Sequence, residues 1–236
     1  MLEYVGYVGF HARRYQHLLK TMYDCYEDGG SIAIFGPSGE YAHIKEHFPE
    51  SSVTIYGKEV PPLEVPPDEL IYIDFNEPND ILEHYDIGVC CEVVEHLTRP
   101  LSAVLNDMLR CCDIVVIQTP NARSLHARLK CAFFQSPFQY VAYTRSYGHV
   151  YEYTLEELTT GLPVMSVSAT NYFGGSTLLR RVYNTIASCL PKTWRDGFTI
   201  VYRGCPVYTR QSVYENGTAC GNYSMSQIFG EGPSDH

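Results

Sequence analysis

The sequence lacks an apolar run long enough to cross a bilayer, and its N-terminus lacks a signal-peptide core because polar residues interrupt it: His11, Arg13, Arg14 and His17. It has nine cysteines but no C-x-x-C pair, which disfavours zinc and thioredoxin-like sites. We therefore expect reduced cysteines, a cytoplasmic location and no transmembrane segment. The net charge of -10 argues against a broad affinity for nucleic acid or anionic membrane, although it allows a local basic surface.

Acidic residues are absent from positions 114–151, where Arg123, Arg128, Lys130 and Arg145 are interleaved with aromatic residues. We interpret about 122–147 as a helical lid insertion. It is either an ordinary amphipathic helix packed on the body or a cover for an aromatic, lipid-linked or phosphate-bearing substrate. From position 204 the chain is rich in Gly, Ser, Tyr and Asn without periodicity. The expected organisation is one domain over 1–203 and an irregular tail over 204–236.

Short apolar runs alternate with helical patterns along the domain. The runs predict strands at 31–35, 53–56, 70–73, 87–91, 114–117, 164–169 and 199–202. Helices are predicted at about 15–26, 41–47 and 100–109, with another after Thr154, which forms a capping box with Glu157. This alternation predicts an α/β fold, doubly wound, with a mostly parallel sheet and helices on both faces.

Three strand ends carry residues suited to a nucleotide-like ligand. After the first strand, Gly36-Pro-Ser-Gly39 lets a ligand approach the backbone near a helix N-terminus. Glu59 follows the second strand, where a ribose diol could bind, and Asp74 follows the third, where it suits an adenine amino group. A nicotinamide-dependent dehydrogenase is disfavoured because the first loop does not supply G-x-G-x-x-G.

The fourth strand ends in Glu92, Glu95 and His96, at positions i, i+3 and i+4. A helix starting here would project all three side chains the same way, at the sheet edge where open α/β folds hold ligands. The competing interpretation is structural: carboxylates favour a first helical turn, and His96 caps or packs.

The segments YDIGVCCEVVEHL, IVVIQTPNA, GHVYEYTLEEL and IAIFGPSGEY resemble the class I S-adenosylmethionine-dependent methyltransferases, over about 30–203. The resemblance implies a seven-strand sheet that binds S-adenosylmethionine at the carboxyl ends of its strands. It places Gly36 and Gly39 beneath the methionine moiety, Glu59 on the ribose and Asp74 near the adenine. Two further residues are expected in the cofactor site: Ser38 and Cys91.

The chain departs from the family pattern at two places. The first loop is shortened and lacks the full glycine triplet, so a catalytically degenerate binding or scaffold protein stays an alternative to the enzyme. The Pro-Gly-Gly turn before the fifth strand is also missing, and the tighter connection over 110–113 replaces it.

Some family members, among them RNA 3′-end 2′-O-methyltransferases and quinone-biosynthetic O-methyltransferases, hold a divalent metal with an E-x-x-E-H segment. The resemblance implies Mg²⁺ or Mn²⁺ on Glu92, Glu95 and His96, with His149 as fourth ligand or Asn121 in its place. The alternative is a metal-free site in which His96 or His149 is the general base.

The favoured function is O-methylation of a small molecule, glycan or lipid-linked intermediate. An RNA 3′ end is the less favoured acceptor, since the chain is acidic but an RNA end needs few phosphate contacts. The sequence leaves the acceptor atom and the oligomeric state undetermined.

Overall fold

The computed structural model describes residues 2–36, 39–58, 63, 66–81, 83–133, 149–171 and 178–204. Seven strands form one sheet: β1 (Ser31–Phe35), β2 (Ser52–Gly57), β3 (Glu69–Tyr72), β4 (Tyr85–Cys91), β5 (Cys112–Pro120), β6 (Val164–Thr170) and β7 (Gly197–Arg203). Their order across the sheet is β3-β2-β1-β4-β5-β7-β6.

The first five strands run parallel, and β7 runs antiparallel to both β5 and β6. The prediction of a mostly parallel seven-strand sheet is therefore confirmed. Central strands are buried on both faces, which explains their continuous apolar runs. At the amino end of β1, Asp86 Oδ2 accepts hydrogen bonds from Ser31 N and Ser31 Oγ, both at 2.7 Å, and so ties β4 to β1.

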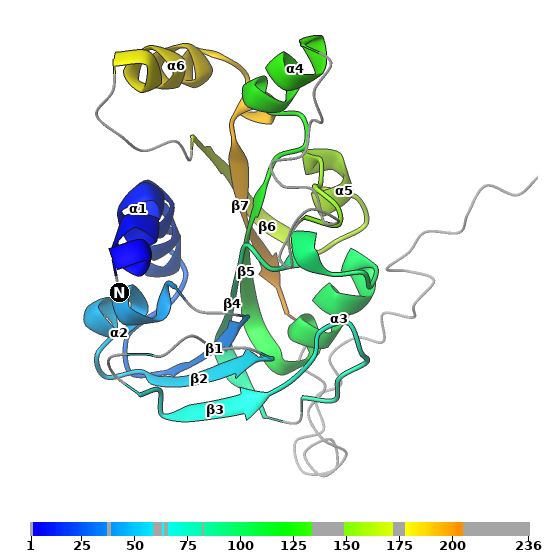
Figure 1. The fold of residues 1–236 in the computed structure, drawn as a ribbon. Coiled ribbons are helices and arrows are strands. Elements are labelled where there is room, and N and C mark those ends of the chain that lie inside the picture. The colour runs from blue at the N-terminus through cyan, green and yellow to red at the C-terminus, as the bar shows by residue number, and fades with distance from the viewer. Residues whose placement is uncertain are drawn as a thin grey trace, which may run out of the picture.

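The α-helices are α1 (Leu2–Tyr23), α2 (Tyr41–His47), α3 (Leu101–Cys111), α4 (Leu125–Ala132), α5 (Leu155–Thr159) and α6 (Leu178–Cys189), with short 3-10 helices η1 (Val94–His96) and η3 (Lys192–Trp194). Figure 1 shows α1 and α2 on one face of the sheet, and α3 and α5 on the other. Helices α4 and α6 lie together beyond the end of β5.

Two hydrophobic clusters fill the two faces of the sheet. Leu18, Ile34 and Val89 belong to the cluster beneath α1 and α2. Leu105 and Phe198 belong to the cluster on the side of α3 and α5. Because successive strand residues point to opposite faces, neighbouring residues such as those of β4 divide between the two clusters.

Two helices differ from the prediction. Helix α1 begins at Leu2 rather than near position 15, since the polar residues that interrupt its apolar pattern do not interrupt the helix. Helix α6 was not predicted at all. The capping box of Thr154 and Glu157 is present as expected.

Part of the predicted lid is described. Helix α4 lies within 122–147, whereas 134–148 lie outside the described residues, as does the predicted tail from 205. Among the residues that the structure covers, no helix has both the length and the apolarity needed to cross a membrane.

Gly36, at the end of β1, is required by packing. Its φ of +119° favours glycine, and an added Cβ would lie 2.2 Å from Val93 Cγ2. The segment after β4 therefore packs directly on the first turn of the predicted cofactor loop.

We predict that Gly36→Ala lowers the free energy of unfolding by about 2–5 kcal/mol, because backbone strain and overpacking add. Gly29→Ala is the matched control: its φ is +96° but nothing lies within 4 Å of the new Cβ, so only strain, about 1–3 kcal/mol, is expected. Urea unfolding measures both. Equal losses would contradict the contact with Val93.

Candidate active site

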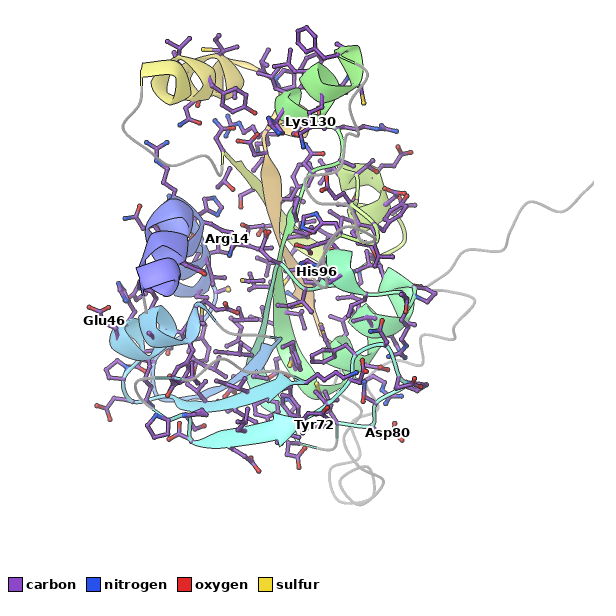
Figure 2. The ribbon with its side chains drawn as sticks, in the orientation of Figure 1. Arg14, Glu46, Tyr72, Asp80, His96 and Lys130 are labelled. Atoms are coloured by element: carbon purple, nitrogen blue, oxygen red, sulfur yellow. The ribbon has the colours of Figure 1, made fainter. Side chains whose placement is uncertain are left out.

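The segment after β4 is not one continuous helix. Glu92 adopts a left-handed φ of 54°, and the chain then forms the single 3-10 turn η1. The expectation that Glu92, Glu95 and His96 share a helical face is therefore wrong. Glu92 turns toward α1, where its Oε2 lies 3.1 Å from Arg14 Nη1, while His96 lies nearer to α3 (Figure 2).

Glu95, His96 and His149 come together instead. One ligand atom from each lies within 4.8 Å of the others, and the rings of His96 and His149 meet edge to face with centroids 4.8 Å apart. Glu95 is fully buried, its Oε2 accepts a hydrogen bond from Thr119 Oγ1 at 3.2 Å, and its Oε1 has no hydrogen-bond partner. A carboxylate and two imidazoles with an unsatisfied buried oxygen form a donor set that fits a divalent metal.

Backbone hydrogen bonds next to His149 hold this residue at the site. The carbonyl of Glu95 accepts from Val150 N at 2.8 Å and from Tyr151 N at 3.1 Å. His149 Nδ1 lies 2.6 Å from Glu152 Oε1, and both side chains are buried. A carboxylate that accepts the Nδ1 proton leaves Nε2 as the ring atom able to take a metal or a proton.

The environment of Glu95 opposes its ionisation. Burial, then the charge of Glu92, raises the pKa of Glu95 well above its usual range. Burial and the neighbouring Glu95 raise the pKa of Tyr153 to about 12. A cation in the site would reverse this preference and favour the carboxylate, as metals do for their ligands.

Asn121, the alternative fourth ligand, has another role. Its Nδ2 donates to the carbonyls of Thr193 at 2.9 Å and Arg195 at 2.7 Å, and its Oδ1 accepts from Arg123 N at 2.9 Å. The amide thus ties the end of β5 to the segment before β7, and its part in a metal site stays a prediction.

A second buried polar group lies beneath α1. Arg14 and Glu40 are each 2% exposed, and the charges of Arg14 and Glu92 both act on Glu40. Glu40 Oε1 and Glu92 Oε1 are buried, and neither has a hydrogen-bond partner among the residues that the structure describes. Burial raises the pKa of Glu40 to about 7, and the charge of Arg14 opposes part of this rise.

The remaining predicted cofactor residues are partly described. Asp74 follows β3, and its Oδ2 accepts from Lys58 Nζ at 2.7 Å, which lowers the pKa of Asp74. Cys91 is buried at the end of β4 against Gln118, and Gly39 lies just before α2. Ser38 and Glu59 lie outside the described residues.

Sequence reasoning missed Thr119, Glu152, Arg14 and Glu40. Of these four, only Glu152 could have been noticed in the sequence. It is the first acidic residue after the acid-free positions 114–151, and it follows His149 by three positions. Nothing in the sequence pairs Arg14 with Glu92, because 78 positions of chain and four strands separate them.

No protein-family model and no curated protein matches the chain. Solved structures do. The putative methyltransferase in complex with the Haloferax volcanii Trm112 activator has a TM-score of 0.59 at 12% identity, over 86% of this chain and 94% of that one. The chain has the fold of the class I S-adenosylmethionine-dependent methyltransferases.

Two further structures agree. A putative S-adenosylmethionine-dependent methyltransferase from Listeria monocytogenes has a TM-score of 0.52 at 9% identity, over 84% of this chain and 99% of that one. The methyltransferase domain of bacterial CtHen1-C has a TM-score of 0.51 at 13% identity, over 83% and 100%. At these identities the likeness shows the methyltransferase fold alone.

Glu40 yields a prediction on stability. Because its folded-state pKa of about 7 lies above the ordinary 4.5, ionising Glu40 costs the folded protein more than the unfolded chain. This cost is absent below pH 4.5, grows up to about pH 7 and is constant above. Glu40→Gln should therefore stabilise the protein by on the order of 3 kcal/mol above pH 7 and change little at acidic pH.

Urea unfolding across this pH range measures the effect. The control is Glu46→Gln, an exposed carboxylate on α2 (Figure 2), which should leave the pH profile unchanged. If Glu40→Gln raises the free energy of unfolding by the same amount at every pH, the gain comes from side-chain packing and not from removal of the charge.

Proposed function

We propose that the protein is an S-adenosylmethionine-dependent O-methyltransferase whose acceptor is a small molecule, a glycan or a lipid-linked intermediate. The observation that carries this proposal is the convergence of Glu95, His96 and His149 beside the carboxyl ends of β4 and β5 in a methyltransferase fold. An acceptor hydroxyl has to lose its proton during methyl transfer. Side chains that bind a metal ion or take up a proton promote this step.

The cofactor would lie across the carboxyl ends of β1, β2 and β4. Gly36, Ser38 and Gly39 would lie beneath its methionine moiety together with Cys91, with Glu59 on the ribose and Asp74 at the adenine. The buried cluster beneath α1 supports this placement. Two carboxylates with unsatisfied oxygens, Glu40 and Glu92, next to the Arg14 guanidinium suit an amino acid group that carries both an ammonium and a carboxylate.

Methyl transfer is an in-line displacement at an activated sulfonium, so the protein has to orient the acceptor and remove its proton. Glu152 fixes the His149 ring through Nδ1, and Glu95 is held by Thr119 and by its own backbone. Mg²⁺ or Mn²⁺ bound by Glu95, His96 and His149 would lower the pKa of an acceptor hydroxyl. In a metal-free site, His149 Nε2 or His96 is the general base.

An RNA 3′ end is the second candidate acceptor. Arg123 and Arg128 are exposed next to the site on the acid-free stretch, where they suit phosphate contacts. The third candidate function is a methyltransferase-like scaffold without catalytic activity. It is favoured by the short first loop, where Val93 packs against Gly36 in the predicted cofactor site.

We predict that the protein binds S-adenosylmethionine and that Asp74→Ala weakens this binding about tenfold or more, because a hydrogen bond to a charged group is worth roughly 1.5–3 kcal/mol. The control is Asp80→Ala, which removes a surface carboxylate paired with Arg110. Calorimetric titration measures both. Absence of binding at millimolar cofactor, with and without Mn²⁺, would favour the scaffold.

Metal binding is tested separately, by Mn²⁺ titration followed by electron paramagnetic resonance. We predict that His149→Ala abolishes Mn²⁺ binding and that Glu152→Gln weakens it about tenfold or more through the orientation of His149. His84→Ala is the control, since His84 pairs with Asp113 on the surface. If the wild-type protein binds the cofactor but not Mn²⁺, the metal site is contradicted and the metal-free site, with a histidine as general base, is favoured.

A further inference from the structure

Acidic residues are absent from two stretches of the chain, not one. Positions 114–151 and 158–195 contain none of the 27 acidic residues, although the whole chain has a net charge of -10. The same stretches contain eight basic residues: Arg123, Arg128, Lys130, Arg145, Arg180, Arg181, Lys192 and Arg195. The charge is therefore strongly polarised along the sequence.

The fold brings the described helices of the two stretches together at one end of the molecule. Helix α4 belongs to the first, and α6 and η3 belong to the second (Figure 1). The guanidinium of Arg128 lies over the Trp194 ring, 4.2 Å from its centroid, and the Tyr183 side chain hydrogen-bonds with the backbone of His126. We call this end, formed by α4, α6 and η3, the basic end.

The basic end also exposes large apolar side chains at helical spacing. Val182 and Ile186, one turn apart on α6, are 49% and 50% exposed. Leu129 and Phe133, one turn apart at the end of α4, are 46% and 73% exposed. Two neighbouring helices thus both present apolar side chains to water on a surface whose charged groups are basic.

We propose that the basic end binds the surface of an anionic lipid bilayer. Exposed Arg123, Arg128 and Lys192 would meet the headgroups, while the apolar pairs of α4 and α6 would enter the boundary between headgroups and acyl chains. An RNA partner is less well matched, because phosphate contacts and base stacking leave aliphatic side chains such as Val182 and Ile186 in water. The acceptor side of the site would then face the bilayer, since α4 follows directly on β5.

The proposal goes beyond the proposed function, and its test requires neither cofactor nor acceptor. The protein is sedimented with vesicles of phosphatidylcholine alone and of phosphatidylcholine mixed with phosphatidylglycerol. Binding is expected only to the mixed vesicles, and it should fall steeply toward about 1 M salt, where the screening length is about 3 Å. Each removed cation, as in Arg123→Gln or Lys192→Gln, should weaken partitioning about fivefold.

The decisive variant is the double substitution Val182→Ser and Ile186→Ser, which should weaken partitioning about tenfold or more. Its matched control is Leu70→Ser with Tyr72→Ser, which removes two apolar side chains of β3, 55% and 73% exposed, at the opposite end (Figure 2). Thermal unfolding verifies that both variants fold.

Three outcomes would overturn the proposal. The first is no sedimentation with either vesicle at low salt. The second is an equal loss in the β3 control, which would mean non-specific adsorption. The third is binding to an RNA oligonucleotide that depends on the same cations but not on Val182 and Ile186, which would assign the basic end to RNA.

Discussion

The buried contact between Arg14 and Glu92 determines how the candidate site is divided. Breaking a buried ion pair of this kind typically costs about 3–5 kcal/mol, since one charge is left without its partner. The pair holds the middle of α1 against the end of β4, where Glu92 has a left-handed backbone. Because the chain turns there, the carboxylate of Glu92 contacts Arg14 of α1, and the next carboxylate, Glu95, accepts a hydrogen bond from Thr119 of β5. One short segment thus supplies carboxylates to two polar clusters.

The second cluster depends on the backbone of Glu95 as much as on its side chain. Its carbonyl receives two N–H groups from Val150 and Tyr151, which fixes where the chain returns from the predicted lid. His149 is therefore placed by main-chain hydrogen bonds and oriented by Glu152, while Thr119 from β5 holds the Glu95 carboxylate. The site thus draws on β5, on η1 and on the segment before α5, and hydrogen bonds between these segments are what preorganises a catalytic group.

The sheet could be predicted because its strands are short apolar runs separated by turns, and a buried strand needs little more than that. The site could be predicted only in part. His96 and His149 follow from the types of residue present, but the position of Glu92 depends on a φ of 54° that no spacing encodes. The hydrogen bonds of Asn121 could not be predicted either, because its Nδ2 donates to the carbonyls of Thr193 and Arg195, which lie 72 and 74 positions away. Helix α6 was missed although two of its apolar residues, Val182 and Ile186, stand one helical turn apart in the sequence.

That last error is informative about the molecule. An amphipathic helix is expected to turn its apolar side inward, whereas Val182 and Ile186 of α6 are about half exposed and Ala187 is fully buried. Folding alone gives no reason to expose Val182 and Ile186, nor to keep acidic residues out of two separate stretches that meet only in the folded protein. Both features have a single physical explanation if the surface that α4 and α6 share works at an apolar, negatively charged boundary. The acidic remainder of the molecule would then be repelled from the same boundary, so the charge polarity that favours docking would also set the orientation in which the acceptor side of the site meets it.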